Sequence, residues 1–423
     1  MSFSLPQRLS ADRPNAIIGS VSLSHFLSHF YFLSFPPLFP LLFAEFDVTY
    51  AELGLLVSSL YAMMFVFQIP FGWVVDRGYA KYVLVGGIVL TAGGLMGAST
   101  ATSYPLLLGF ALLSGVGQAT YHPADYALLD VVSSDERKGK NFSLHTFTGY
   151  AGSGVAPVVV GGIGIRHGWR VALLLVGAVG IVYAVALQLG IETVYANQLE
   201  SDETDDQETN DGDQSVVREL LSPFFRLPIL GMFLFFVVLV AGESGIQSFT
   251  VVFLVESLEL DESTGNTALT AFFALASIGV LVGGFLADRF SAANIVIGTL
   301  TVTAAITFLL TFGLLPVTVV ISLALFAVIG FGYGLVMPAR DRLVSTLSPD
   351  QSVGKSFGLV FTGAAVGGTT GPVLIGSAID VTSPSVSMLL VGASFLAGAG
   401  IILLVKLSRL TTRPTVATLR DII

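Results

Sequence analysis

Long apolar runs separated by short polar stretches alternate along nearly the whole chain. A helix needs about 20 apolar residues to cross the hydrocarbon core of a bilayer. Lipid offers the backbone no hydrogen-bond partners, so each run must be helical. The pattern predicts an all-α membrane protein with twelve transmembrane helices, at residues 16–44, 51–75, 82–101, 104–131, 140–164, 169–195, 227–256, 265–287, 292–312, 315–345, 353–379 and 385–407.

The second half of the chain repeats motifs of the first half at a constant distance of 215 residues (330 − 115 = 215). Gly115, Gly117, Pro123, Gly139, Gly152 and Pro157 recur as Gly330, Gly332, Pro338, Gly354, Gly367 and Pro372. Two copies of one multi-helix unit are typical of transporters whose site lies between the halves. We predict two pseudo-symmetric six-helix bundles, 1–195 and 227–423, joined by an acidic cytoplasmic linker, 196–226.

The basic residues predict the orientation of the chain in the membrane. If the N-terminus is cytoplasmic, 17 of the 19 Lys and Arg residues fall on the cytoplasmic side, and only Arg166 and Arg170 fall outside. The positive-inside rule therefore predicts a multi-pass protein of the plasma membrane with both termini in the cytoplasm.

Composition excludes several classes of function. Hydrophobic residues make up 53% of the chain, the net charge is −10 and there is no Cys. An acidic balance disfavours nucleic acid as a partner, and the lack of Cys excludes thiolate catalysis and Cys-ligated metals. No Walker A sequence and no nucleophile–base pair stands at convincing spacing. We expect a monomer without enzymatic activity or cofactor, driven by a proton gradient and contacting lipid and a small-molecule substrate.

A family resemblance rests first on the segment from Gly72 through Asp76 and Arg77 to Lys81, between the second and third runs. It resembles the G-x-x-x-D-R-x-G-x-[RK] loop of the major facilitator superfamily. Asp288 and Arg289 echo it in the second half. The resemblance implies the major facilitator fold and transport by alternating access. It also implies that Gly72, Asp76, Arg77, Asp288 and Arg289 govern conformational exchange.

A narrower resemblance rests on Tyr121-His122-Pro123 after Gly115-x-Gly117. This segment is similar to fosmidomycin-resistance-type exporters, and the Gly/Pro pattern ending in Pro157 is similar to drug–proton antiporters. Pro372 stands in the corresponding run of the second half. The resemblance implies proton-coupled export of a drug-like molecule. The alternative is that these glycines only allow helices to pack closely.

Ionisable residues inside the runs are the candidate site residues, because such groups are costly in a bilayer and usually functional. The first run carries His25 and His29 on one helix face. Either can exchange a proton or pack structurally. No acidic third ligand lies near them in the sequence, so we predict no metal site. His145, near the inner end of the fifth run, is interpreted as structural.

The fourth run carries Gln118, Tyr121, His122 and Asp125, whose spacing makes one continuous polar face. Pro123 is expected to kink this helix, and Pro338 the tenth.

The seventh run carries Glu243 and Gln247, and the tenth carries Tyr333 and Arg340. Arg340 is the repeat counterpart of Asp125 (125 + 215 = 340). We expect the two charges to form a cytoplasmic gate; the alternative is that Arg340 snorkels to the membrane boundary. Glu243 is a candidate for proton binding.

Together these features predict a secondary active transporter that exports a small organic molecule in exchange for protons. Glu243, His122, Asp125 or the histidines of the first run would carry the proton, with sodium as the alternative ion. An uptake symporter of a small organic anion is the second hypothesis, with Arg340 holding the anion. A membrane-embedded receptor or enzyme is the remote alternative.

Overall fold

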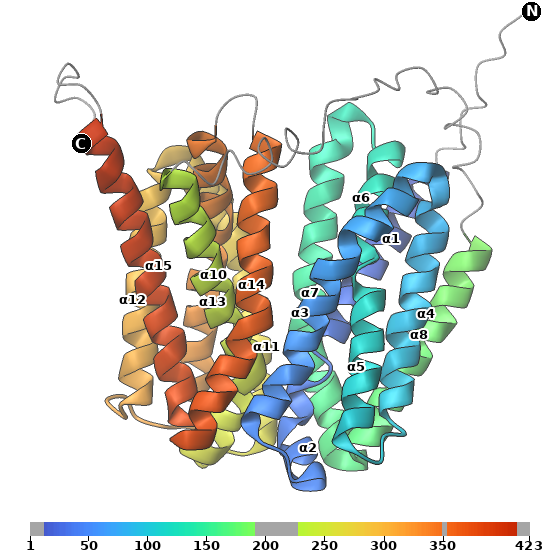
Figure 1. Cartoon of the computed structure of the whole chain (residues 1–423), viewed down its shortest axis with the longest axis horizontal. Helices are drawn as coiled ribbons and strands as arrows, with labels where there is room; N and C mark the ends of the chain where they lie inside the picture. Colours follow the sequence, from blue (N-terminus) through green and yellow to red (C-terminus); the bar gives the residue numbers. More distant parts are fainter. Residues whose placement is uncertain (1–11, 191–226, 349–352, 413–423) are drawn as a thin grey trace, which may run out of the picture. The chain divides into compact units, whose positions relative to one another are not determined.

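The computed structural model describes residues 12–190, 227–348 and 353–412, and every regular element in these ranges is a helix. The elements are α1 (Asp12–Phe32), η1 (Pro36–Leu38), α2 (Phe39–Phe46), α3 (Tyr50–Val74), η2 (Val75–Tyr79), α4 (Ala80–Ala98), α5 (Tyr104–Gln118), α6 (Tyr121–Val132), α7 (Asp135–His167), α8 (Trp169–Gly190), α10 (Leu227–Val252), η5 (Phe253–Ser257), α11 (Glu262–Arg289), α12 (Ala292–Thr311), α13 (Val319–Leu347), α14 (Val353–Val381) and α15 (Ser385–Thr412). Figure 1 shows these helices running side by side within each half of the chain. The prediction of an all-α membrane protein is confirmed.

Ten helical segments of the described chain are long and apolar enough to cross a membrane. One of them, Tyr50–Ala98, has 49 residues and contains two of the predicted spans. The predicted span 104–131 is divided between α5 and α6, which have only 15 and 12 residues. The ten long segments therefore correspond to eleven of the twelve predicted spans, and α5 with α6 corresponds to the remaining one.

The turn between the second and third crossings depends on a glycine. Gly78 has φ 88° and lies in the π-helical segment η2, where the chain turns from α3 into α4. Only glycine adopts this conformation without a steric penalty. The glycine of this loop thus has a local physical reason in this chain: it allows the backbone to turn from α3 into α4.

The fourth crossing is interrupted beside a proline. α5 ends at Gln118, and α6 begins at Tyr121, two residues before Pro123. Proline has no N–H to donate to the carbonyl four residues earlier, which here belongs to Ala119. In the second half, α13 continues through Pro338, so the two copies of the repeat differ at this point.

Contacts divide the chain into two units. The first unit contains described residues 12–41 and 59–190, and the second contains 42–58, 227–348 and 353–412. The beginning of α3, up to Ser58, therefore groups with the second unit.

Repeated glycines place helix backbones in contact inside each unit. A Cβ atom on Gly152 of α7 would collide with the carbonyl of Phe26 in α1. Gly330 of α13 faces the carbonyl of Phe272 in α11 in the same way, and Gly367 of α14 faces that of Val237 in α10. Gly152, Gly330 and Gly367 are thus helix-packing positions, as small residues at membrane-helix interfaces usually are.

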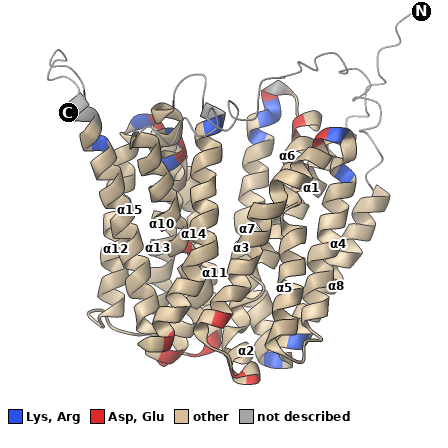
Figure 2. Ribbon diagram, in the orientation of Figure 1, with Lys and Arg blue, Asp and Glu red and all other residues tan. Residues whose placement is uncertain are grey.

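Most charged residues lie near the ends of the helices, and carboxyl groups such as those of Asp125 and Glu243 are exceptions. Within each unit, Lys, Arg, Asp and Glu gather at the two ends of the helices (Figure 2). This distribution and the ten apolar segments are those of a multi-pass membrane protein.

Candidate functional site

Four of the chain's five histidines come together inside the first unit with a carboxyl group. We call His25, His29, His122, Asp125 and His145 the His–Asp cluster. The ring of His25 lies 3.8 Å from that of His145, 4.6 Å from that of His29 and 5.3 Å from that of His122, measured between centroids. Three helices, α1, α6 and α7, supply these five side chains.

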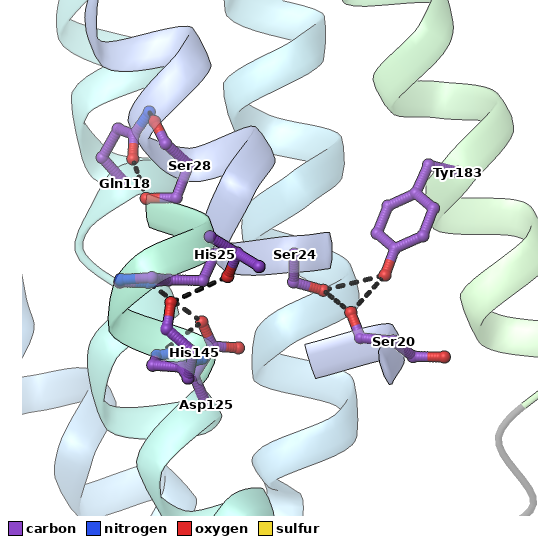
Figure 3. Close-up of polar contacts among 9 residues, drawn as sticks. Ser20, Ser24, His25, Ser28, Gln118, Asp125, His145 and Tyr183 are labelled. Carbon is purple, nitrogen blue, oxygen red and sulfur yellow. Dashed lines mark hydrogen bonds and ion pairs between the residues drawn. The ribbon is translucent and has the colours of Figure 1, made fainter. Parts of the chain in front are cut away.

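Asp125 lies at the centre of the cluster and is fully buried. Its Oδ2 is 3.7 Å from Nδ1 of His25 and 4.0 Å from Nε2 of His145 (Figure 3). His145 is fully buried as well, and His25 is only 4% exposed. One ligand atom from each of these three residues lies within 4.8 Å of the others, so the trio is a candidate metal centre.

Close helix packing fixes the position of His25. A Cβ atom on Gly149 of α7 would lie only 2.6 Å from Nε2 of His25. Gly149 follows His145 by one helical turn. The imidazole of His25 therefore packs against both His145 and the backbone of Gly149 on α7. His29, one turn along α1, has its Nδ1 3.3 Å from the hydroxyl oxygen of Ser153.

Gln118 and Tyr121, the other polar residues predicted on this face, are engaged in packing. The Gln118 amide donates to the backbone carbonyl of Ser28 at 3.0 Å and accepts from the Ser28 hydroxyl at 2.8 Å, which fastens α5 to α1 (Figure 3). Tyr121 belongs to a buried apolar core with Val21, Leu84 and Leu129. Both residues thus contribute to the packing of the first unit.

The second unit contains another buried polar arrangement, centred on Glu243 of α10. The hydroxyl of Tyr333 on α13 donates a hydrogen bond to one carboxylate oxygen. The amide of Gln247, one turn along α10, donates to the other at 3.2 Å. Tyr333 itself is buried beside Phe272 and Phe395. The sequence-predicted residues Glu243, Gln247 and Tyr333 are therefore in direct contact.

Arg340, the cation predicted in the tenth run, lies on the same helix as Tyr333. It follows Tyr333 by seven residues on α13, which places both on one helix face. Its guanidinium lies 4.7 Å from the ring centre of Phe236, and its Nε is 3.3 Å from Oδ1 of Asp341. The pairing of Asp125 with Arg340 stays a prediction.

The predicted conformational residues lie mostly at helix ends. Asp76 and Arg77 are exposed in η2, and the Arg77 guanidinium stacks on Trp73 at 3.2 Å while donating to its carbonyl. Asp288 accepts from Arg342 at 3.4 Å, and Arg289 stacks on Phe285. The remaining positions are the half-buried Gly72, Pro123 and Pro338, and the buried Pro157 and Pro372.

Sequence reasoning overlooked several polar contacts. Asp380 accepts hydrogen bonds from the backbone N–H groups of Tyr50, at 2.7 Å, and Ala51, at 3.0 Å, at the beginning of α3. The Tyr50 hydroxyl donates to Glu256 at 2.5 Å. His145 was a missed member of the cluster, although an ionisable residue within an apolar run is itself a signal of function.

Comparison with known proteins places the chain in a family. The sequence model of the Major Facilitator Superfamily matches residues 21–261 and 232–421. An uncharacterized MFS-type transporter of Bacillus subtilis, YfnC, is 23% identical over 397 residues, which cover 91% of each chain. The fosmidomycin resistance protein of Escherichia coli is 23% identical over 362 residues, covering 83% of this chain and 85% of that protein. The membrane sensor protein UhpC of Escherichia coli is 26% identical over 294 residues, covering 66% and 65%.

The fold is also that of solved transporters. A crystal structure of a bacterial homologue of the human lysosomal transporter Spinster superposes with a TM-score of 0.76 at 16% identity, covering 97% of this chain and 100% of that one. The expected resemblance is confirmed, and the expected fold with it. The chain belongs to the major facilitator superfamily.

Proposed function

We propose that this protein is a secondary active transporter that exports a small organic molecule and takes up protons in return, with Glu243 as the proton-carrying group. The observation that carries the proposal is the contact of Glu243 with Tyr333 and Gln247 inside the second unit. A carboxyl group within a membrane span is costly, and such groups usually serve ion movement. Membership of the family supports a transport function. The contacts of Glu243 support this residue as the group that couples transport to protons.

The hydrogen-bond partners of Glu243 suit a group that changes protonation state. A tyrosine hydroxyl can donate to a carboxylate or accept from a carboxylic acid, because its O–H rotates. The Gln247 amide donates to Oε1 of Glu243, and it can do so whether or not the other oxygen, Oε2, carries a proton. Neither partner carries a charge that would be stranded when Glu243 gains or loses a proton. Arg340 lies seven residues beyond Tyr333, on the same face of α13.

Export is supported by one relative. Its name states resistance to fosmidomycin, and removal of a compound from the cell is a direct route to resistance. The sequence resemblance around His122 and Pro123 points the same way.

Uptake of a small organic anion is the second candidate, and Arg340 is the observation that favours it. Its half-buried guanidinium lies two helical turns from Tyr333, and guanidinium binds carboxylate and phosphate groups bidentately. In this case the anion and the proton of Glu243 would enter together. The name of the relative UhpC raises a third function, sensing. A sensor without transport activity would not change the internal level of any compound.

Accumulation in energised cells tests the proposal. Wild type, Glu243→Gln and an exposed control, Glu136→Gln, are compared for fosmidomycin, lipophilic cations and small organic acids. Export predicts a lower internal level with wild type and with the control, restored by an uncoupler and absent with Glu243→Gln. A higher internal level of an organic acid would reverse the direction and favour uptake. Transport by Glu243→Gln that still responds to the proton gradient would contradict the role of Glu243.

A further inference from the structure

The His–Asp cluster of the first unit takes no part in the coupling assigned to Glu243, yet it concentrates unsatisfied polar atoms. Among the described residues, both oxygens of Asp125, both ring nitrogens of His145 and the Nδ1 atoms of His25 and His122 are buried without a hydrogen-bond partner. A buried polar atom without a partner costs about 1–3 kcal/mol, so native proteins rarely contain several together. Six such atoms in one place indicate a ligand that they share.

We propose that His25, Asp125 and His145 bind a divalent transition-metal ion of the zinc type. Zinc bonds to imidazole nitrogen and carboxylate oxygen are about 2.0–2.2 Å long. In a tetrahedral site, the donor atoms are then about 3.3 Å apart. The His25–Asp125 and His145–Asp125 separations are 3.7 and 4.0 Å, and all three donors lie within 4.8 Å of one another. Side-chain movements that shorten these separations by about 0.4 to 1.5 Å would complete the geometry.

The chemistry of the donors selects the class of ion. Two imidazoles and one carboxylate suit Zn²⁺, Co²⁺ or Ni²⁺, whereas Mg²⁺ and Ca²⁺ prefer oxygen ligands alone. The chain has no Cys, so the soft thiolate ligands that favour Cu(I) are absent. Three protein ligands would leave one position of a tetrahedral ion for a further ligand.

The helices hold the three ligands in place without the ion. Each comes from a different helix, and α1 and α7 are in backbone contact at Gly152. The imidazoles of His25 and His145 stack with an interplanar angle of 24°, and both present a nitrogen to the same oxygen of Asp125. A bound ion would connect α1, α6 and α7 within the first unit. The sequence predicted no metal site because Asp125 lies a hundred residues after His25 (125 − 25 = 100).

The test is a titration of purified full-length protein, free of any histidine tag, with Co²⁺ followed by Zn²⁺. Mg²⁺ is kept in large excess to compete for the carboxylates of the acidic stretch 200–213, whose side chains offer oxygen ligands and no imidazole. We expect one equivalent of Co²⁺ to produce the visible absorption bands of tetrahedral coordination, and Zn²⁺ to abolish them. His25→Gln, Asp125→Asn and His145→Gln should each weaken binding by at least about tenfold.

His167→Gln is the matched control, because His167 is the one histidine outside the cluster and is exposed. It should bind Co²⁺ as wild type does. X-ray absorption of the wild-type Zn²⁺ complex gives a readout that needs no variant and should show scattering from two imidazoles. No saturable binding by wild type, equal affinity in the three ligand variants, or an oxygen-only shell would overturn the proposal. None of these outcomes depends on the transport assay, so the metal site and the role of Glu243 stand or fall separately.

Discussion

The hydroxyl of Tyr333 on α13 donates a hydrogen bond to the carboxylate of Glu243 on α10. The two residues are 90 positions apart in the chain. The contact brings together the seventh and tenth of the predicted spans, both of which were expected to carry site residues. It also gives the buried carboxyl group a neutral partner, which is the basis of the coupling proposed above.

Removing this partner should impair transport while leaving the fold intact. Tyr333→Phe deletes only the hydroxyl, and a hydrogen bond to a charged group is worth about 1.5–3 kcal/mol. We expect proton-dependent transport to fall by about 10- to 100-fold. Uptake or efflux rates at fixed substrate concentration measure the change. Tyr82→Phe, at an exposed tyrosine, is the control; an equal loss in both variants would show that the contact has no special role.

Gly78 should be intolerant of any side chain. Gly78→Ala places a Cβ at φ 88°, which costs about 1–2 kcal/mol in the left-handed region. The thermal midpoint of the purified protein should therefore fall. Gly86 lies within α4 with open space around its Cβ position, so Gly86→Ala should be neutral or slightly stabilising. A lowered midpoint in Gly86→Ala but not in Gly78→Ala would refute the assignment of the turn.

Glycines of the repeat that lie at helix contacts should tolerate substitution by alanine less well than glycines with open space around them. Gly330→Ala drives a methyl group into the carbonyl of Phe272 and must push α13 away from α11. We expect a loss of about 1–3 kcal/mol, seen as poor yield and aggregation in size-exclusion chromatography. Gly284→Ala on α11 meets nothing within 4 Å and should behave like wild type. Normal yield of Gly330→Ala would mean that the helices are packed differently.

Asp261, which lies outside the membrane spans, makes a pH-dependent contribution to the stability of the folded protein. As the N-cap of α11, it accepts from the N–H of Thr264 at 2.8 Å and from its hydroxyl at 2.7 Å. These bonds from Thr264 lower the pKa of the Asp261 carboxyl. The stabilisation is therefore complete above the unfolded pKa of about 3.9 and is lost as the pH falls through the lower folded value.

Asp261→Ala should accordingly lower stability by about 1 kcal/mol at neutral pH. The difference from wild type should shrink as the pH is lowered below about 4. Thermal midpoints of both proteins across this range measure it. A difference that grows towards acid would contradict the assignment of the cap.

Hydropathy alone predicted most of the architecture, because each crossing must be a long apolar helix. It also placed Glu243, Gln247 and Tyr333 within spans, and the structure brings these residues into contact. The break between Gln118 and Tyr121 could be expected near Pro123, since proline removes a backbone donor. Gly78 was visible in the sequence, but its positive φ was not, because φ depends on the direction that the following helix takes.

The His–Asp cluster shows what the sequence lacked. His145 looked structural because it lies near the inner end of its run, and nothing in its spacing reveals that α7 packs on α1. Its proximity to Asp125 depends on the rotation of three helices about their axes. That rotation is set by backbone contacts such as that of Gly152 with Phe26. In the same way, the capping of α3 by Asp380 joins residues 330 positions apart.

Proton movement measured in proteoliposomes tests the central claim most directly. Purified protein is reconstituted with a pH-sensitive dye inside, and a gradient of the compound identified in the cellular assay is applied. The account predicts that wild type and Glu136→Gln move protons against the compound. Glu243→Gln, which keeps a hydrogen-bond acceptor for Tyr333, should exchange labelled for unlabelled compound without moving protons. Proton movement by Glu243→Gln at the wild-type rate would contradict the account.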